Sequence, residues 1–315
     1  MALKQVSYII VTWNNADIIT DCIDSLLQFS KVENQIIVVD NDSKDATCSV
    51  IKDKYGEDVI LIETGENLGF SKANNLGLAK ATGDYIFFIN PDVVFIEDIV
   101  SPMLQVLDTC PDVGIVSPML IYPDRSYQVS TCNFPSAQKV FWDDLHFYKL
   151  LPADRRLKLA QAQCRCGGNR FVDWTYGAAH LCRADDVRSI GGYPQGYFMY
   201  GEDTEFCMAF LHELGLKNYY LGSSKLIHLG GYSEKQVVNS KKIIYGTNAA
   251  MYFVNKYYGK ASLVRYRIIL AFASLLKYLV AWLKCLLHNT QKNRNSKVKW
   301  GASFMTVLRY RGEQN

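Results

Sequence analysis

Several features that would assign a class at once are missing from this chain of 315 residues. It has 8 prolines and 21 glycines, which excludes collagen-like and low-complexity proteins. The low hydrophobicity and high charge of a disordered chain are also absent, since 49% of the residues are hydrophobic and 21% are charged. We therefore expect one large or two modest globular domains with a buried core.

The cysteines and the N-terminus lack two further signatures. The nine cysteines include no Cys-x-x-Cys pair, and Cys164 and Cys166 have the wrong spacing for a zinc site. Their odd count predicts mostly reduced thiols, as in a cytosolic protein. No charged leader with an apolar core and a small-residue cleavage site opens the sequence, so we expect a cytoplasmic location.

The formal net charge of +3 hides an uneven distribution. Residues 256–315 contain twelve Lys and Arg and one acidic residue, Glu313, for a net charge of +11. Residues 1–255 contain 22 basic and 30 acidic residues, for a net charge of −8. An acidic body with a basic tail indicates association with an anionic surface or polymer.

The first hundred residues alternate strand and helix patterns. Short apolar runs predict strands over residues 6–11, 35–40, 59–62 and 85–89. Apolar residues at helical spacing predict helices over residues 17–29 and 71–81. This alternation predicts an α/β fold with a parallel sheet covered by helices, whose ligands bind at the carboxyl ends of the strands.

Polar residues stand where three of these strands end: Thr12 and Asn14, Asp40 and Asp42, and Asn90 and Asp92. A dehydrogenase would need Gly-x-Gly-x-x-Gly after the first strand, and the sequence has none. A carboxylate such as Asp92 can hold a divalent cation, which in turn neutralises a diphosphate. Ordinary turns and helix caps explain the same residues locally.

A glycine loop precedes the second predicted helix. Gly69 permits a close approach of the backbone, Lys72 can meet a phosphate, and a helix N-terminus favours an anion. Ordinary loop chemistry is the alternative for Asn67-Leu68-Gly69.

Taken in order, these segments resemble the motifs of family 2 glycosyltransferases. The matching segments are Val11–Asn14, Val39–Ser43, Asn67–Phe70, Asn90–Asp92, Val172–Ala178, Gly191–Tyr193, Tyr197–Asp203 and Ile227–Gly231. They cover about residues 5–235, and their combination in order is far more specific than any one of them. The set is most similar to bacterial rhamnosyltransferases that build O-antigen, a part of lipopolysaccharide, and related cell-wall polysaccharides.

The resemblance implies a GT-A fold, which is a Rossmann-like, mostly parallel sheet flanked by helices, with a helical basic tail added here. Residues 1–100 would form the nucleotide-sugar-binding half and residues 101–239 the acceptor-binding and catalytic half. Residues 240–315 would form C-terminal helices at a membrane surface. The donor would be a nucleotide-diphosphate sugar, transferred with inversion at the anomeric carbon.

The resemblance also assigns nucleotide contacts to nine residues: Thr12, Asn14, Asp40, Asp42, Asn67, Gly69, Lys72, Asn74 and Asn90. Asp92 and His228 would hold Mg²⁺ or Mn²⁺. Asn90 replaces the first carboxylate of the family's Asp-x-Asp motif, so Asp92 is the single acidic ligand from this loop. A structural histidine at a strand end is the alternative for His228.

The reaction is assigned to Glu202 and Asp203. An inverting transfer needs a base that takes the proton from the acceptor hydroxyl as that oxygen attacks C1 opposite the leaving group. By resemblance Asp203 is the base, and Glu202 orients acceptor hydroxyls or tunes Asp203. Acidic residues also suit the first turn of a helix, and the two roles are compatible.

Three residues are expected on the acceptor side: Trp174, Gly177 and Tyr200. Aromatic rings suit the apolar faces of sugars, although core packing is the alternative for both aromatic residues. Residues 132–168 are too irregular to assign, and within them residues 155–163 predict either a short helix or a mobile acceptor-side loop.

Residues 266–288 form an apolar run long enough to cross a bilayer. Lys277 falls in the middle of this run, however, and a lysine at the bilayer centre is costly. We therefore expect an amphipathic helix that lies in an anionic membrane surface, with Lys277 and Lys284 in the headgroups. The alternative is a helix packed on the catalytic domain or on a homodimer partner. Nucleic-acid binding is disfavoured, because no recognisable module accompanies the charge.

Together with the basic tail, the resemblance implies a metal-assisted inverting glycosyltransferase on the inner face of the bacterial cytoplasmic membrane. The expected reaction moves L-rhamnose from dTDP-β-L-rhamnose to a polyprenyl-diphosphate-linked saccharide. A UDP-hexose or UDP-galactofuranose donor is the alternative within the class, because contacts to uracil and thymine look alike. A nucleotide-sugar-binding scaffold without turnover is the alternative from another class, and the intact Glu202-Asp203 pair argues against it.

Overall fold

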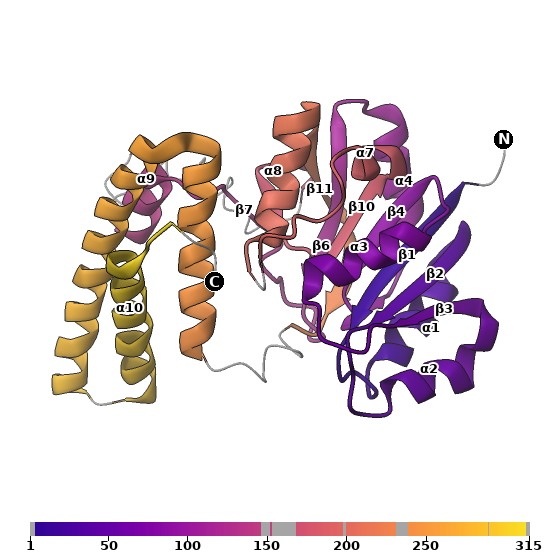
Figure 1. Cartoon of the computed structure of the whole chain (residues 1–315), viewed down its shortest axis with the longest axis horizontal. Coiled ribbons are helices and arrows are strands. Elements are labelled where there is room, and N and C mark those ends of the chain that lie inside the picture. The colour runs from indigo at the N-terminus through magenta and orange to yellow at the C-terminus, as the bar shows by residue number, and fades with distance from the viewer. Residues whose placement is uncertain are drawn as a thin grey trace. The chain divides into compact units, whose positions relative to one another are not determined.

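The computed structural model describes residues 4–145, 152, 168–197, 200–230, 239–288 and 290–312. The chain divides into two compact units, each described by itself (Figure 1). The first comprises residues 1–132, 161–198 and 202–234, and the second comprises residues 133–160, 199–201 and 235–315. The segment predicted as a short helix or loop, residues 155–163, lies outside the described residues.

The four predicted strands form one half of the sheet in the first unit. They are β1 (Gln5–Thr12), β2 (Glu33–Asp40), β3 (Val59–Glu63) and β4 (Tyr85–Ile89). All four are parallel, in the order β3-β2-β1-β4. Every residue of β4 is buried, as expected of a parallel strand with helices on both faces. The predicted parallel sheet is therefore confirmed.

The sheet continues with strands from the middle of the chain. They are β10 (Ala179–Arg183), β6 (Val113–Ile121), β11 (Lys217–His228), β5 (Val93–Phe95) and β8 (Arg170–Val172). Strand β10 lies antiparallel between β4 and β6, while β5 and β8 run antiparallel to β11. The sheet is thus mixed, with most strands in one direction. A separate pair joins β7 (Thr131–Cys132) to β9 (Trp174–Thr175).

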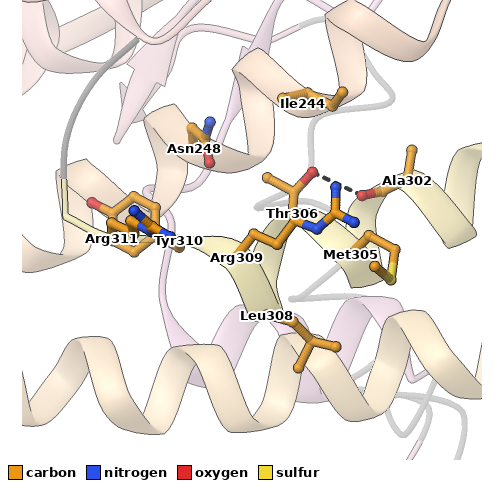
Figure 2. Close-up of a pocket in the computed structure, with 9 residues that line it drawn as sticks. All are labelled: Ile244, Asn248, Ala302, Met305, Thr306, Leu308, Arg309, Tyr310 and Arg311. Atoms are coloured by element: carbon orange, nitrogen blue, oxygen red, sulfur yellow. Dashed lines mark hydrogen bonds between the residues drawn. The ribbon is translucent and has the colours of Figure 1, made fainter.

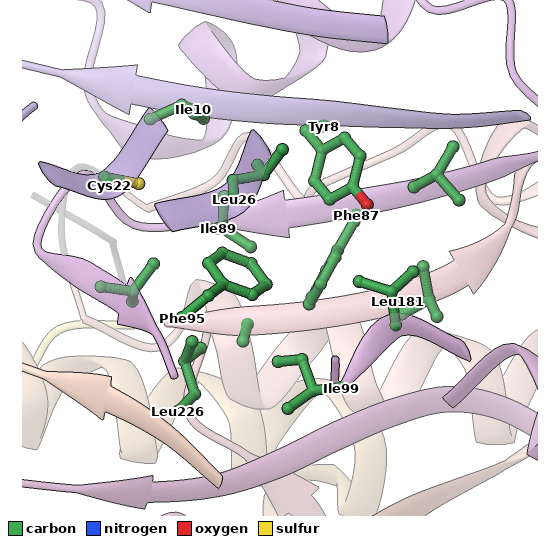
Figure 3. Packing of buried hydrophobic residues seen from close by; sticks show 14 of the residues in the cluster. Tyr8, Ile10, Cys22, Leu26, Phe87, Ile89, Phe95, Ile99, Leu181 and Leu226 are labelled. Carbon is green, nitrogen blue, oxygen red and sulfur yellow. The ribbon is translucent and has the colours of Figure 1, made fainter. Parts of the chain in front are cut away.

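The helices of the first unit cover both faces of this sheet. They are α1 (Ile19–Phe29), α2 (Thr47–Tyr55), the 3-10 turn η1 (Gly56–Asp58), α3 (Phe70–Lys80), α4 (Val100–Thr109), α7 (Ala184–Ser189) and α8 (Glu202–Leu214). On one face, the ring of Phe87 packs against Tyr8 and Phe95 in the main core, shown in Figure 3. On the other, a Cβ at Gly77 would lie 2.5 Å from Ile9 Cγ2, so glycine permits α3 to lie directly on β1.

The second unit is helical. Its described elements are α5 (Ala137–Lys139), the π-helical turn η2 (Val140–Asp144), α9 (Asn239–Leu287) and α10 (Gln291–Arg309). Helix α9 breaks at Gly259, where φ is 79° and ψ is 171°. Beyond the break, Ser274 Oγ lies 3.1 Å from Ser303 Oγ, and Arg267 donates to the Val307 carbonyl at 2.9 Å. Residues 260–287 and 291–309 therefore form a helical pair, which we name the C-terminal hairpin.

A pocket of about 910 Å³ lies within this unit, where the first part of α9 meets the end of α10 (Figure 2). Ile244 and Asn248 line it from α9, and Met305 and Arg309 line it from α10. No residue in the sequence-predicted site lines this pocket.

Candidate active site

The ends of β1 and β2 bring Thr12 and Asp40 side by side, as register partners that are both buried. Oδ2 of Asp40 accepts a hydrogen bond from the N–H of Ser43 at 2.9 Å. Oδ1 is also buried and accepts no N–H or O–H hydrogen bond from the described residues, while the thiol of Cys48 interacts with this carboxyl group. Because an unsatisfied buried carboxylate oxygen is costly, this atom is suited to accept an N–H from a ligand.

Asn14 and Asp42 shape the loop beside that carboxylate. Both have positive φ, 54° and 70°. The N–H of Asn14 donates to Ser43 Oγ at 2.8 Å, and its Oδ1 accepts from the N–H of Lys44 at 2.7 Å. Asp42 pairs with Lys44 Nζ at 2.6 Å. These contacts are those of the turn alternative, and the nucleotide contacts of Asn14 and Asp42 stay predictions.

Asn41 is a residue that sequence reasoning did not single out. Its Nδ2 donates to Asn67 Oδ1 at 3.0 Å, and its Oδ1 accepts from the N–H of Leu68 at 2.8 Å. Asn67 Oδ1 also accepts from the N–H of Gly69 at 3.0 Å, where φ is 78° directly before α3. The loop after β3 is thereby tied to the end of β2. In the sequence, only the position of Asn41 between Asp40 and Asp42 pointed to a role. Its partner could not be predicted, because Asn67 lies 26 residues away along the chain.

Helix α3 carries two of the residues predicted to contact the nucleotide, and these contacts stay predictions. Lys72 is exposed, whereas Asn74 is buried and donates to the carbonyl of Phe70 at 3.0 Å. Asn75, which was also missed, exchanges two hydrogen bonds of 2.8 Å with the backbone of Tyr193. A Cβ at Gly192 would lie 2.3 Å from Asn75 Oδ1, so the Gly-Gly-Tyr motif is built around this side chain.

Asp92 and His228 meet at the far edge of the site. Nε2 of His228 lies 3.3 Å from Oδ1 of Asp92, and strands β5 and β11 pair Val93 with His228. Asn90 is held by its N–H, which donates to the Ala178 carbonyl at 3.1 Å. In the part of the chain that the structure describes, no cluster of three His, Cys, Asp or Glu forms. Mg²⁺ is commonly held by one or two carboxylates together with substrate phosphates, and Asp92 supplies one such carboxylate beside His228. The cation at this pair stays a prediction.

Asp203 lies in the first turn of α8, where its Oδ2 accepts the N–H of Gly177 at 2.9 Å. A Cβ at Gly177 would lie 2.1 Å from Oδ1, so only glycine fits against this carboxylate. Burial raises the pKa of Asp203 to about 6, and the hydrogen bond from Gly177 opposes that shift. A general base must be ionised before the reaction and basic enough to accept a proton during it. A carboxyl group whose pKa lies near the working pH meets both requirements.

Helix α8 stands on a buried aromatic layer. The ring of Phe206 stacks on Tyr193 at 4.1 Å between centroids, and His180 stacks on Phe206 at 5.8 Å. His180 Nδ1 lies 2.9 Å from the Tyr193 hydroxyl, and its Nε2 lies 2.9 Å from Thr175 Oγ1. Burial lowers the pKa of His180 to about 4, so this imidazole is neutral. The layer gives the first turn of α8, with the buried Glu202, a rigid support.

The two aromatic residues predicted on the acceptor side fall in different units. Trp174 lies in β9, with the Tyr176 ring 5.1 Å away between centroids. Tyr200 belongs to the second unit and has φ of 66°, with Lys242 Nζ 5.2 Å from its ring centroid. Their contact with an acceptor stays a prediction.

The C-terminal hairpin exposes an apolar stripe along α9. Its members recur at helical spacing: Val264, Ile268, Phe272, Leu275, Leu276, Leu279, Leu283 and Leu286. Lys277 places Nζ 4.1 Å from the ring centroid of Trp300 on α10, and its expected place in the headgroups stays a prediction. By length and composition, the helical stretch Lys241–Leu287, which contains the break at Gly259, is long and apolar enough to cross a membrane. The lysine that argued against insertion therefore lies outside the stripe.

Comparison with known families identifies the enzyme class. A family model described as "Glycosyl transferase family 2" matches residues 7–177, more than half of the chain. The chain is a family 2 glycosyltransferase. The matched range contains Asp40, Asp92 and Gly177, and Asp203 lies beyond it, joined to it by the Gly177 hydrogen bond.

Two curated relatives are named as rhamnosyltransferases. The N-acetylglucosaminyl-diphospho-decaprenol L-rhamnosyltransferase of Mycobacterium tuberculosis is 26% identical over 217 residues, covering 63% of this glycosyltransferase and 67% of that protein. Rhamnosyltransferase WbbL of Escherichia coli K12 is 25% identical over 241 residues, covering 73% and 86%.

Two solved structures confirm the predicted GT-A fold. The mannosyltransferase PcManGT from Pyrobaculum calidifontis, in complex with GDP-Man and Mn²⁺, aligns with a TM-score of 0.59 and 15% identity over 98% of this chain and 87% of that one. GalNAc-T7 with UDP, GalNAc and Mn²⁺ aligns with a TM-score of 0.60 and 14% identity over 98% and 56%.

Proposed function

We propose that this glycosyltransferase moves L-rhamnose from dTDP-β-L-rhamnose to a polyprenyl-diphosphate-linked saccharide, with inversion. The observation that carries the reaction is the carboxylate of Asp203, held by the Gly177 N–H with a pKa of about 6. The names of the two rhamnosyltransferase relatives support the donor and the lipid-linked acceptor. Residues 1–100 then bind the nucleotide sugar, and residues 101–239 bind the acceptor and carry the base.

In this proposal the pyrimidine of the sugar donor lies against Asp40. Uracil and thymine each carry one N–H between two carbonyls, and the buried Oδ1 of Asp40 accepts no N–H or O–H hydrogen bond from the described residues. Asn41 and Asn67 hold the neighbouring loop in place before the nucleotide arrives. Thymine and uracil share this N–H, so a UDP-hexose or UDP-galactofuranose is the alternative donor.

The transfer itself is a single displacement. The acceptor hydroxyl oxygen attacks C1 of the sugar while Asp203 takes its proton, and the bond between C1 and the diphosphate oxygen breaks. Attack opposite the leaving group converts the β-linked donor into an α-L-rhamnosyl product. Asp92 and His228 would hold Mg²⁺ or Mn²⁺, which when bound would neutralise charge on the departing nucleoside diphosphate.

We also propose that the enzyme works at the inner face of the bacterial cytoplasmic membrane. The apolar stripe would enter the boundary of the acyl chains, and the basic residues of the hairpin would attract anionic headgroups. A surface location of this kind suits an acceptor whose polyprenyl tail is embedded in the bilayer.

A donor screen tests the proposal. The full chain is incubated with dTDP-β-L-rhamnose, UDP-hexoses or UDP-galactofuranose, a polyprenyl-diphosphate-linked N-acetylglucosamine and Mn²⁺. We expect release of dTDP that depends on the acceptor, together with a rhamnosylated lipid. Release of UDP would move the enzyme to the alternative donor. Consumption of no donor with any acceptor would contradict turnover and favour the scaffold alternative.

A further inference from the structure

Gln128 lies beside the proposed cation site although no sequence motif contains it. Its Oε1 is 2.8 Å from Nδ1 of His228, on the opposite side of the ring from the Nε2 that faces Asp92 at 3.3 Å. An amide, an imidazole and a carboxylate thus follow one another in a line. Gln128 precedes His228 by 100 residues, so only the fold reveals this neighbour.

The loop after β6 holds Gln128 by its backbone. Its N–H donates to the Leu120 carbonyl at 3.0 Å, and its own carbonyl accepts from Ser130 Oγ at 2.9 Å. Ser130 Oγ in turn lies 2.9 Å from the N–H of Leu120, which closes the connection to β6. These hydrogen bonds fix the backbone from which the Gln128 side chain extends.

Gly230 leaves the space that the amide of Gln128 occupies. Its φ is 70°, and a Cβ at this position would lie 2.7 Å from Gln128 Nε2. The same chain segment thus carries the imidazole, at His228, and the room for its partner, two residues later. Any other residue at 230 would displace the amide.

We propose that Gln128 is a positioning residue that holds His228 as its Nδ1–H tautomer. A neutral imidazole has one N–H, and donation from Nδ1 to the amide oxygen leaves a lone pair on Nε2, the atom that faces Asp92. This lone pair can bind a cation together with the Asp92 carboxylate. A proton on Nε2 would instead donate to Asp92 and close the pair to the ion. The inference rests on the proposed function only in the choice of a divalent cation as the ion.

The tautomer can be observed without metal or substrate. The full chain is labelled with ¹⁵N in its histidine rings and observed by long-range ¹H–¹⁵N NMR at about pH 8. The signal of His228 is identified by its loss in His228→Gln. We expect the proton on Nδ1 in the wild type and in Gln128→Glu, which retains an acceptor, and a shift toward Nε2 in Gln128→Leu. A proton on Nε2 in the wild type would overturn the proposal.

Affinity for Mn²⁺ alone, measured by electron paramagnetic resonance, provides the second measurement. We expect Gln128→Leu to weaken binding about 10–100-fold, as for other acceptors behind ligating histidines, and Gln128→Glu to preserve it. Gln35→Leu is the matched control, since Gln35 Oε1 also accepts two hydrogen bonds, from Ser7 Oγ and the N–H of Thr82.

Three results would contradict the role of Gln128: no Mn²⁺ binding by the wild type, unchanged affinity in Gln128→Leu, or an equal loss in Gln35→Leu. Failure of the glycosyl-transfer proposal gives a different result. In that case no donor would be consumed, while the tautomer and the Mn²⁺ affinities would behave as expected.

Discussion

The two units of this glycosyltransferase differ in which side chains they bury and which they expose. The first buries polar side chains near the strand ends, such as Asp40 and Asp92, and the second exposes large apolar ones, such as Phe272 and Leu286. Burial of a carboxylate and exposure of a continuous apolar stripe are both unfavourable without a partner. The proposed function would use both features: a charged, polar donor would meet the first unit and a lipid surface would meet the second.

The largest effect is expected in the first unit, from Asp203→Asn. The amide cannot accept the acceptor proton, so the transfer rate should fall by about 10²–10⁴-fold, the usual contribution of a general base. Affinity for the nucleoside diphosphate should stay nearly unchanged, because the loops at Asp40 and Asn67 are untouched. Stopped-assay rates and calorimetric titration measure the two quantities. Wild-type-like turnover would remove Asp203 as the base.

A smaller loss is expected from Gly177→Ala. The new Cβ would meet the Asp203 carboxylate at 2.1 Å, so the base must move. A misplacement of about 1 Å can cost about 10²-fold in rate, and we expect a loss of that order. Gly246→Ala is the control, because a Cβ there meets nothing within 4 Å. Equal activities of the two variants would show that the contact at Gly177 does not position the base.

The second unit is tested by changing its stripe. Replacing Phe272, Leu279 and Leu286 together by serine removes apolar area that would enter the bilayer. Each fully buried side chain of this kind contributes about 1.5–3 kcal/mol, so partitioning onto anionic vesicles should fall at least about tenfold. The matched control is the triple serine variant of three exposed leucines of the first unit, Leu27, Leu76 and Leu211. Unchanged sedimentation with vesicles would refute the surface role of the stripe.

A more modest effect is expected from Asp40→Asn. The amide weakens the acceptor offered to the pyrimidine N–H, and a hydrogen bond to a charged group contributes about 1.5–3 kcal/mol. We expect the Kd for dTDP or UDP to rise about tenfold or more. Asp24→Asn is the control, since Asp24 is paired with Lys54 at the surface. The same Kd in both variants would show that the pyrimidine does not contact Asp40.

The smallest effect concerns stability and pH. Burial raises the pKa of Asp203 to about 6, so the native state binds more protons than the unfolded state between about pH 4 and 6. Stability from this group is therefore present at low pH and lost as the pH rises through 6. At a pH above 7, Asp203→Asn should thus raise the free energy of unfolding by no more than about 3 kcal/mol, and the Tm should rise with it. The gain should be smaller near pH 5. A Tm gain independent of pH would contradict the raised pKa.

Local sequence patterns predicted the four parallel strands of the first unit. Residues 85–89 were predicted as a strand and form β4 with the same bounds, because a short run of apolar residues buried on both faces has few other solutions. The pairing of Asp92 with His228 was expected only by resemblance, since 136 residues separate them along the chain. Asn41, Asn75 and Gln128 were missed for the same reason, because each acts on a partner in another loop or strand.

By itself, the sequence determined the four parallel strands of the first hundred residues, the polar residues at their ends and the family, because periodicity and short motifs are local properties. Only the tertiary structure decided which polar groups are satisfied. It gave Asn14 and Asn67 internal partners, set the Gly177 N–H against Asp203 and turned Lys277 toward Trp300. Hydrogen bonds and burial depend on distances between segments remote in sequence, and these distances exist only once the sheet and the hairpin have formed.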